Sequence, residues 1–262
     1  MPDKSLTAGI VIPCFNEETR LPTARISAWA AAHPSVHFRF VDDGSTDGTG
    51  PLIDSLAATI GGDRASAVHL ARNGGKGEAV RAGLLSLVSS GQFDAIGYWD
   101  ADLATPLDEI PQFVAYLASN PVCQVVLGSR VRLLGRRVGR RLSRHLLGRV
   151  FATLASIALD MQVYDTQCGA KLLRVTPQLT ALMSTPFRSR WVFDVEILER
   201  LVGKWAEAGE PYGGPADQRI VELPVTEWED VRGSKLRWRH YLGVLRALWG
   251  VFKRRRKSAA SK

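Results

Sequence analysis

Two carboxylates, Asp100 and Asp102, stand one residue apart at the end of an apolar run that begins at Ile96. Side chains alternate between the two faces of a strand, so both carboxylates point the same way if the extended backbone continues. Two oxygen ligands on one side suit Mg²⁺ or Mn²⁺, which usually binds one or two carboxylates together with substrate phosphates. The alternative is a solvated turn in which an aspartate caps the helix expected after Thr105 and Pro106.

Two further loops carry groups that could bind a phosphorylated ligand. Asp42 and Asp43 open a turn rich in Asp, Gly and Ser, and a later glycine-rich loop contains Arg72 and Lys76. This loop is not a P-loop, because Gly77 follows Lys76 where a P-loop has Ser or Thr, and the glycine spacing also differs. Arg72 and Lys76 could still reach a phosphate. Alternatively, the glycines serve only a tight turn and close helix packing.

Apolar runs and helical patterns alternate along the first half of the chain, and these candidate groups follow apolar runs. Strands are expected at 9–13, 36–41, 67–70, 96–99 and 122–128, and helices at 21–32, 52–60, 79–88 and 110–117. The alternation predicts a doubly wound α/β fold, with a parallel sheet and helices on both faces. Because the carboxyl ends of parallel strands meet at one edge of such a sheet, we expect the candidate side chains to lie together there.

The second half of the chain departs from this alternation. We expect a helix over much of 136–159, a turn and a strand within 164–173, and a final strand at 220–225. Pro224 favours an edge position for that last strand. Asp194 and Glu196 fall near the start of another predicted helix. Carboxylates in a first turn complement the helix dipole, so Asp194 is either structural or a candidate general base.

The formal net charge of +8 is concentrated in two stretches without acidic residues. Eight arginines lie within 130–149, and ten Lys and Arg residues lie from 235 to the end, so the rest of the chain is net acidic. Such patches suit phosphate groups, nucleic acid or an anionic membrane. Within 235–257 the apolar residues recur at mostly helical spacing, which predicts a basic amphipathic helix in a membrane interface. The alternative is a helix docked on the core with a solvated basic tail.

The remaining composition sets the broad class of protein. We divide the chain into a main α/β domain at 1–234 and a basic amphipathic helix and tail at 235–262. The three cysteines are scattered, without zinc or redox spacing, which indicates a reducing compartment. No signal-peptide pattern is present, and no apolar run approaches the roughly 18 residues that predict a spanning helix.

Three motifs together resemble the inverting glycosyltransferases of family 2. They are VIPCFNE at 11–17, VDDGSTD at 41–47 and DADLATP at 100–106. Three later motifs are similar to the branch of dolichyl-phosphate β-glucosyltransferases and polyprenyl-phosphate glycosyltransferases: GSR at 128–130, DTQCG at 165–169 and WVFDVE at 191–196. The resemblance runs in order from about residue 9 to about residue 235.

The resemblance implies a GT-A fold, a nucleotide-sugar donor and Mg²⁺ or Mn²⁺ as cofactor. Asp42 or Asp43 would read the base, and Asp100 and Asp102 would hold the ribose and the metal. The donor-binding residues would be Pro13, Glu17, Asp42, Asp43, Arg72, Lys76, Asp100, Ala101 and Asp102. Arg130 and Arg144 would face the acceptor phosphate, and Asp102, Asp194 and Arg130 are the candidate catalytic residues.

The family resemblance also sets an expectation for the membrane. Its eukaryotic glucosyltransferases carry an N-terminal membrane helix, and many bacterial relatives carry C-terminal ones. We expect neither here. Instead, we expect peripheral contact through 235–257 on the inner face of the cytoplasmic membrane.

The chemistry of transfer depends on the acceptor. The donor diphosphate leaves as an anion, which a divalent cation with Lys76 or Arg72 would stabilise. A lipid phosphate is already a nucleophile near neutral pH, because the second pKa of a phosphomonoester is about 6. A sugar hydroxyl would need a base, and Asp194 is the best-placed candidate.

Three functions follow, with different requirements. The leading hypothesis is inverting transfer of a hexose, glucose from UDP-glucose, to a polyprenyl phosphate; GDP-mannose and N-acetylhexosamine donors stay open. The second keeps the donor but uses a soluble or saccharide hydroxyl acceptor, which makes Asp194 indispensable. The third is nucleic-acid binding through the two basic stretches. It leaves the carboxylate loops without a purpose, so we expect no nucleic-acid partner.

Overall fold

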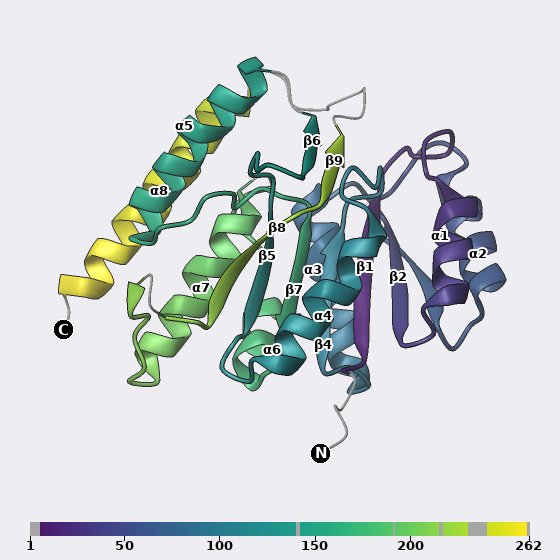
Figure 1. Ribbon diagram of the computed structural model, residues 1–262, viewed down its shortest axis with the longest axis horizontal. Helices are drawn as coiled ribbons and strands as arrows, with labels where there is room; N and C mark the ends of the chain where they lie inside the picture. Colours follow the sequence, from purple (N-terminus) through teal and green to yellow (C-terminus); the bar gives the residue numbers. More distant parts are fainter. Residues whose placement is uncertain (1–5, 140–141, 191, 215–216, 230–239, 261–262) are drawn as a thin grey trace.

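The computed structural model describes residues 6–139, 142–190, 192–214, 217–229 and 240–260 (Figure 1). Seven strands form one sheet in the order β3-β2-β1-β4-β7-β5-β8. Their bounds are β1 Ala8–Cys14, β2 Val36–Asp42, β3 Ala65–His69, β4 Ala95–Trp99, β5 Val125–Ser129, β7 Ala170–Arg174 and β8 Ile220–Pro224. The sheet confirms the mostly parallel α/β architecture.

One strand, β7, is the antiparallel exception in this mostly parallel sheet. It pairs antiparallel with both β4 and β5, whereas the other pairs in the sheet are parallel. The direction follows from where β7 starts. Gly169, just before it, accepts a 2.9 Å hydrogen bond from the backbone N–H of Asp100, which lies just after β4. The chain therefore enters β7 at the carboxyl edge of the sheet and must run back. Alternation of elements along the sequence does not reveal this reversal.

Helices cover both faces of the sheet, as the alternation predicts (Figure 1). Those on one face are α1 Thr23–Ala32, α2 Thr49–Ile60 and α4 Ile110–Ser119, the last preceded by the short 3₁₀ helix η1 Leu107–Glu109. Those on the other face are α3 Lys76–Ser90, α5 Leu142–Leu159, α6 Pro177–Met183, α7 Phe193–Glu207 and α8 His240–Ala260. Strand side chains alternate accordingly, because Val11 packs with the second group while Ile10 and Ile12 pack with the first.

Three short elements were not predicted from the sequence. The strand β6 Arg137–Gly139 pairs in parallel with β9 Glu227–Glu229 outside the main sheet. β6 lies where a helix was expected from residue 136, whereas the helix α5 begins at Leu142. The helix α6 follows β7 directly. Strands of three residues carry no readable periodicity, and their pairing comes from segments far apart in sequence.

The C-terminal helix α8 packs against the rest of the protein. Leu248 and Val251 are buried in the same apolar core as α3 and α7. Arg254 makes a two-point ion pair with Glu199 of α7, with nitrogen–oxygen distances of 2.6 and 2.8 Å. The predicted boundary at residue 234 lies outside the described residues. Among the helices that the structure describes, none has the length and apolar character needed to cross a bilayer.

Candidate active site

The loops that follow β1, β2 and β4 meet at the carboxyl edge of the sheet, as predicted. The backbone N–H of Glu17 donates to Thr49 Oγ1 at 2.8 Å, and that of Asp43 donates to the carbonyl of Cys14 at 2.8 Å. The Glu17 carboxylate, held by Arg20 at 2.8 Å, contributes to raising the pKa of Asp102. These contacts bring the three predicted motifs into one site.

Asp43 organises the glycine-rich loop. Its two carboxylate oxygens accept hydrogen bonds of 2.8 Å each from the backbone N–H groups of Gly74 and Gly75. Burial raises the pKa of Asp43, while these two N–H groups and the charge of Arg190 act in the opposite direction. Gly75 has φ +90°, a conformation that favours glycine. Arg190 packs over Gly75 and donates to the carbonyl of Asn73 at 3.2 Å.

The other predicted donor-binding residues around this loop occupy different positions. Asp42 is buried, accepts from the backbone N–H of Ser45 at 2.9 Å and lies 3.6 Å from His69 Nδ1. Arg72 is exposed at the start of the glycine-rich loop. Pro13 lies on β1 in register with Val41 of β2. The specific role of Asp42 or Asp43 in reading a base stays a prediction.

Lys76 lies against the paired carboxylates. It begins α3, and its Nζ lies 2.5 Å from Asp100 Oδ1. Burial would lower the pKa of Lys76, but the charges of Asp100 and Asp194 raise it above its ordinary value, so the ammonium stays protonated. Asp102 accepts from the backbone N–H of Ala104 at 3.1 Å. Burial and the neighbouring charge of Asp100 raise the pKa of Asp102. Lys76 thus partly neutralises a site that carries surplus negative charge.

Gly169 makes room for Asp100. A Cβ at this position would lie 2.0 Å from Asp100 Oδ2, so no other residue fits without moving the carboxylate. The small residue at the end of the DTQCG motif therefore sets where the aspartate lies. Ala101, between the two aspartates, is buried.

The two aspartates fit a divalent cation. Among the described residues, no group of three or more His, Cys, Asp and Glu side chains forms a metal site. The chain therefore offers Asp100 and Asp102, and the other ligands would come from a substrate diphosphate and water, which is a common arrangement for Mg²⁺. The raised pKa of Asp102 supports this fit, because a cation would relieve the repulsion between the two carboxylates.

Asp194 is held by two residues that sequence reasoning missed. Lys171 Nζ lies 2.7 Å from Asp194 Oδ1 and also donates to the carbonyl of Cys168 at 2.6 Å. The hydroxyl of Tyr98 donates to the same oxygen of Asp194. Lys171 is the only charged residue inside β7 before its terminal arginine, and Tyr98 lies in the fully buried β4. A lysine in a buried strand was the available signal.

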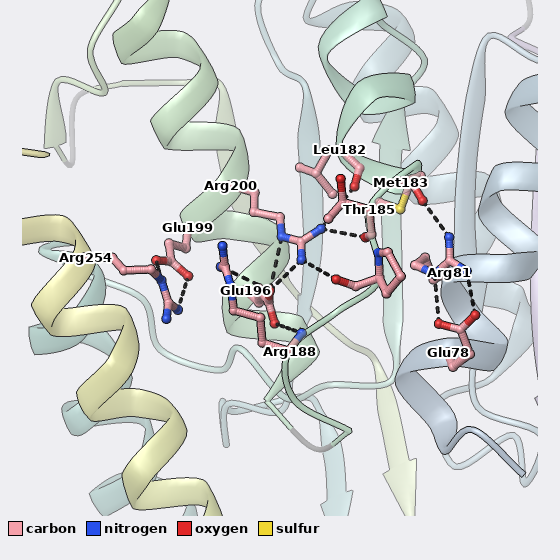
Figure 2. A network of polar contacts seen from close by, with 11 residues as sticks. Glu78, Arg81, Leu182, Met183, Thr185, Arg188, Glu196, Glu199, Arg200 and Arg254 are labelled. Atoms are coloured by element: carbon pink, nitrogen blue, oxygen red, sulfur yellow. Dashed lines mark hydrogen bonds and ion pairs between the residues drawn. The ribbon is translucent and has the colours of Figure 1, made fainter.

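The loop between α6 and α7, which leads into this site, is held by arginines (Figure 2). Glu196 accepts from Arg200 at 2.6 Å and from the backbone N–H of Arg188 at 2.9 Å. Arg81 of α3 donates to the carbonyl of Met183 at 2.9 Å. Glu196, in the same first turn as Asp194, therefore holds the backbone of this loop in place.

Arg130 is bound to Asp165 in a buried two-point pair. Its Nε and Nη2 lie 2.6 and 2.8 Å from the two carboxylate oxygens. Burial would raise the pKa of Asp165. The charge of Arg130 and its hydrogen bonds have the larger effect and hold the pKa of Asp165 below its ordinary value. The guanidinium also faces the ring of Trp228 at 5.3 Å. The pair joins the GSR and DTQCG motifs. Arg144 belongs to α5, and its side chain lies outside the described residues.

An open, mostly parallel sheet with paired aspartates and a lysine at its carboxyl edge defines an α/β protein whose charged groups lie where such folds bind their ligands. The family model for glycosyl transferase family 2 matches residues 9–177, which include all but one strand of the main sheet. The chain belongs to this family, and it is a glycosyltransferase.

Curated relatives are similar to this chain over most of its length, and a solved structure shares its fold. The dolichyl-phosphate beta-glucosyltransferase of Drosophila melanogaster is 29% identical over 249 residues, covering 88% of this chain and 70% of the relative. The polyprenol monophosphomannose synthase of Mycolicibacterium smegmatis is 29% identical over 217 residues, covering 83% of this chain and 76% of the relative. The structure of glucosyl-3-phosphoglycerate synthase from Mycobacterium tuberculosis with Mn²⁺, UDP-glucose and phosphoglyceric acid has a TM-score of 0.59. It is 20% identical, covers 94% of this chain and 78% of that chain, and shares its fold.

Proposed function

We propose that this glycosyltransferase moves a hexose, glucose from UDP-glucose, onto a polyprenyl phosphate with inversion at the anomeric carbon. An oxygen of the lipid phosphate forms the new bond to that carbon. The bond from the same carbon to the β-phosphate oxygen of the donor breaks, and the nucleoside diphosphate leaves with the electron pair. The product is a β-linked lipid-phosphate sugar. Two curated relatives are named dolichyl-phosphate beta-glucosyltransferase and polyprenol monophosphomannose synthase, and these names support this acceptor class.

The contacts of Asp194 support the choice of acceptor. Its Oδ1 already accepts from both the Lys171 ammonium and the Tyr98 hydroxyl, so two donors of the protein occupy the oxygen that a substrate hydroxyl would have to approach. A hydroxyl acceptor requires a group that takes up a proton, whereas a phosphate acceptor near neutral pH requires none. The geometry therefore favours the phosphate.

The nucleotide-sugar donor would bind at the carboxyl edge of the sheet. Asp100 and Asp102 would hold Mg²⁺ or Mn²⁺, which when bound stabilises the charge of the departing diphosphate. Lys76, already protonated beside Asp100, would bind a diphosphate oxygen, and the exposed Arg72 would reach the same group. Asp43 holds the glycine-rich loop in the conformation that presents Lys76.

Arg130 and Arg144 would bind the phosphate of the lipid acceptor. The pair with Asp165 occupies Nε and Nη2 of Arg130, and among the described residues Nη1 makes no hydrogen bond to Asp165, so we propose that it binds a phosphate oxygen. We propose peripheral membrane contact through 235–257, on the cytoplasmic face. Cys14, Cys123 and Cys168 are buried, and their scattered spacing fits a reducing compartment.

The experiment measures transfer of radiolabelled sugar from a panel of UDP- and GDP-sugars to polyprenyl phosphate, with Mg²⁺ or Mn²⁺. The wild type is compared with Asp102→Ala. We expect metal-dependent labelling of the lipid by one donor, lost in the variant. Donor hydrolysis or a soluble product with an unlabelled lipid would contradict the lipid acceptor and favour a hydroxyl acceptor.

A further inference from the structure

The helix α5 is apolar on two sides, and only one of them is covered. Ala155, Ala158 and Leu159 are buried in the core of the protein. A second stripe follows helical spacing on another side and is 36–59% exposed, formed by Leu146, Leu147, Val150, Leu154 and Ile157. A helix that is apolar on all sides is normally buried on all sides. The exposed stripe therefore indicates a missing contact.

The neighbouring helix α8 continues this apolar surface. α5 and α8 lie side by side at one end of the sheet (Figure 1). Leu245 and Trp249 of α8 are 49% and 56% exposed, and an open groove of about 400 Å³, lined by apolar side chains of both helices, runs between them. We call the exposed stripe of α5 together with Leu245 and Trp249 the two-helix face.

The charged residues of the two helices that form this face are all basic, and the nearest acid along the chain is Asp160, just after α5. Arg246 and Lys253 of α8 are exposed, and Lys253 lies over the ring of Trp249 at 5.5 Å. No acidic residue occurs within 130–149 or from 235 to the end of the chain. A second copy of the chain would bring like charges together across a two-fold axis. An anionic lipid surface would neutralise them, and its acyl region would cover the leucines.

We propose that the two-helix face binds an anionic bilayer, with α5 supplying most of the inserted apolar surface and α8 supplying the flanking cations. α8 alone is insufficient, because Leu248 and Val251 are used in the core. α5 also contacts the proposed acceptor side of the site, where Asp165 binds Arg130. Arg149 of α5 donates to the carbonyl of Tyr164, the neighbour of Asp165, at 3.1 Å and stacks on its ring at 3.8 Å. This inference rests on the proposed function in one respect: a lipid acceptor gives the membrane contact its purpose.

The experiment measures binding of the full chain to vesicles by sedimentation. One set contains equal parts of phosphatidylcholine and phosphatidylglycerol, and the other contains phosphatidylcholine alone. The variant Leu147→Gln/Ile157→Gln removes two exposed side chains of α5. Val122→Gln is the matched control, because Val122 is 61% exposed in the turn before β5, outside both helices.

We expect the double variant to lose at least about tenfold in vesicle partitioning, because each buried aliphatic side chain contributes roughly that factor. We expect Val122→Gln to bind as the wild type does, and binding to be weaker without phosphatidylglycerol. Thermal unfolding and UDP binding confirm that the variants are folded. Unchanged partitioning of the double variant would overturn the proposal. So would a wild-type dimer, seen by light scattering, that the double variant converts to monomer.

The two proposals fail in distinguishable ways. A short, water-soluble prenyl phosphate tests transfer without any bilayer. Transfer to this acceptor without vesicle binding would overturn the two-helix face and leave the proposed function standing. Vesicle binding that depends on Leu147 and Ile157, without transfer to any lipid phosphate, would overturn the proposed function and leave the two-helix face standing.

Discussion

The ammonium group of Lys171 lies 2.7 Å from Asp194 Oδ1, and both side chains are almost completely buried. The lysine comes from the antiparallel strand β7, and the aspartate comes from the first turn of α7. This pair lies close to Lys76, because the charge of Asp194, together with that of Asp100, raises the pKa of Lys76. The pair therefore bears on both the stability of the fold, as a buried ion pair, and the charge of Lys76 in the candidate site.

Lys171→Met should destabilise the protein by about 3–5 kcal/mol, because removal of one partner leaves a buried charge uncompensated. Chemical denaturation measures the loss. The double variant Lys171→Met/Asp194→Asn should recover much of it, since both charges are then gone. If the losses of the two single variants simply added, the two residues would not interact.

Asp194→Asn should reduce transfer to a prenyl phosphate by less than about tenfold, whereas loss of a general base typically costs 10²–10⁴-fold. Initial rates are measured at a temperature at which the variant is folded. Asp102→Ala provides the contrast, because it should abolish metal-dependent transfer. A loss above a hundredfold for Asp194→Asn, with a changed pH profile, would assign Asp194 as the base.

Gly169→Ala should lower the transfer rate by about a hundredfold, because the new methyl group would displace the Asp100 carboxylate and small misplacements have effects of that size. The metal concentration needed for half-maximal rate should rise as well. Gly203→Ala in α7 is the matched control, since a Cβ there has no neighbour within 4 Å. Equal activity of the two variants would contradict the role of Gly169.

Asp43→Asn should raise the KM for the nucleotide sugar by about tenfold and change kcat less. Asparagine offers one acceptor oxygen where the carboxylate now accepts from both Gly74 and Gly75, so one partly buried N–H loses its partner. Steady-state kinetics separates the two constants. A fall in kcat at constant KM would instead place Asp43 in the reacting centre.

Asp102→Asn should stabilise the metal-free protein at neutral pH while it inactivates the enzyme. The folded-state pKa of Asp102 is raised by burial and by Asp100, so its ionisation above that pKa favours the unfolded state. The difference in melting temperature should disappear as the pH falls below the ordinary pKa of an aspartate, where both forms are neutral. A variant that is less stable than the wild type at neutral pH would contradict this assignment.

The sequence by itself determined the α/β sheet and the groups at its carboxyl edge. Asp42 ends a strand, and Asp43, Asp100 and Asp102 come just after one. Both strands are readable from local apolar runs, and parallel strands bring such ends together. These predictions succeed because strand pattern and strand end are short-range properties.

The tertiary structure alone decided the partners of those groups. Tyr98 and Asp194 are 96 residues apart in sequence, and Arg130 and Asp165 are 35 apart. The reversed β7 places Lys171 behind Asp194, and the packing of α5 decides which apolar stripe is buried and which is exposed. Periodicity shows that a residue is apolar or charged, but which side chain it meets depends on how distant segments pack.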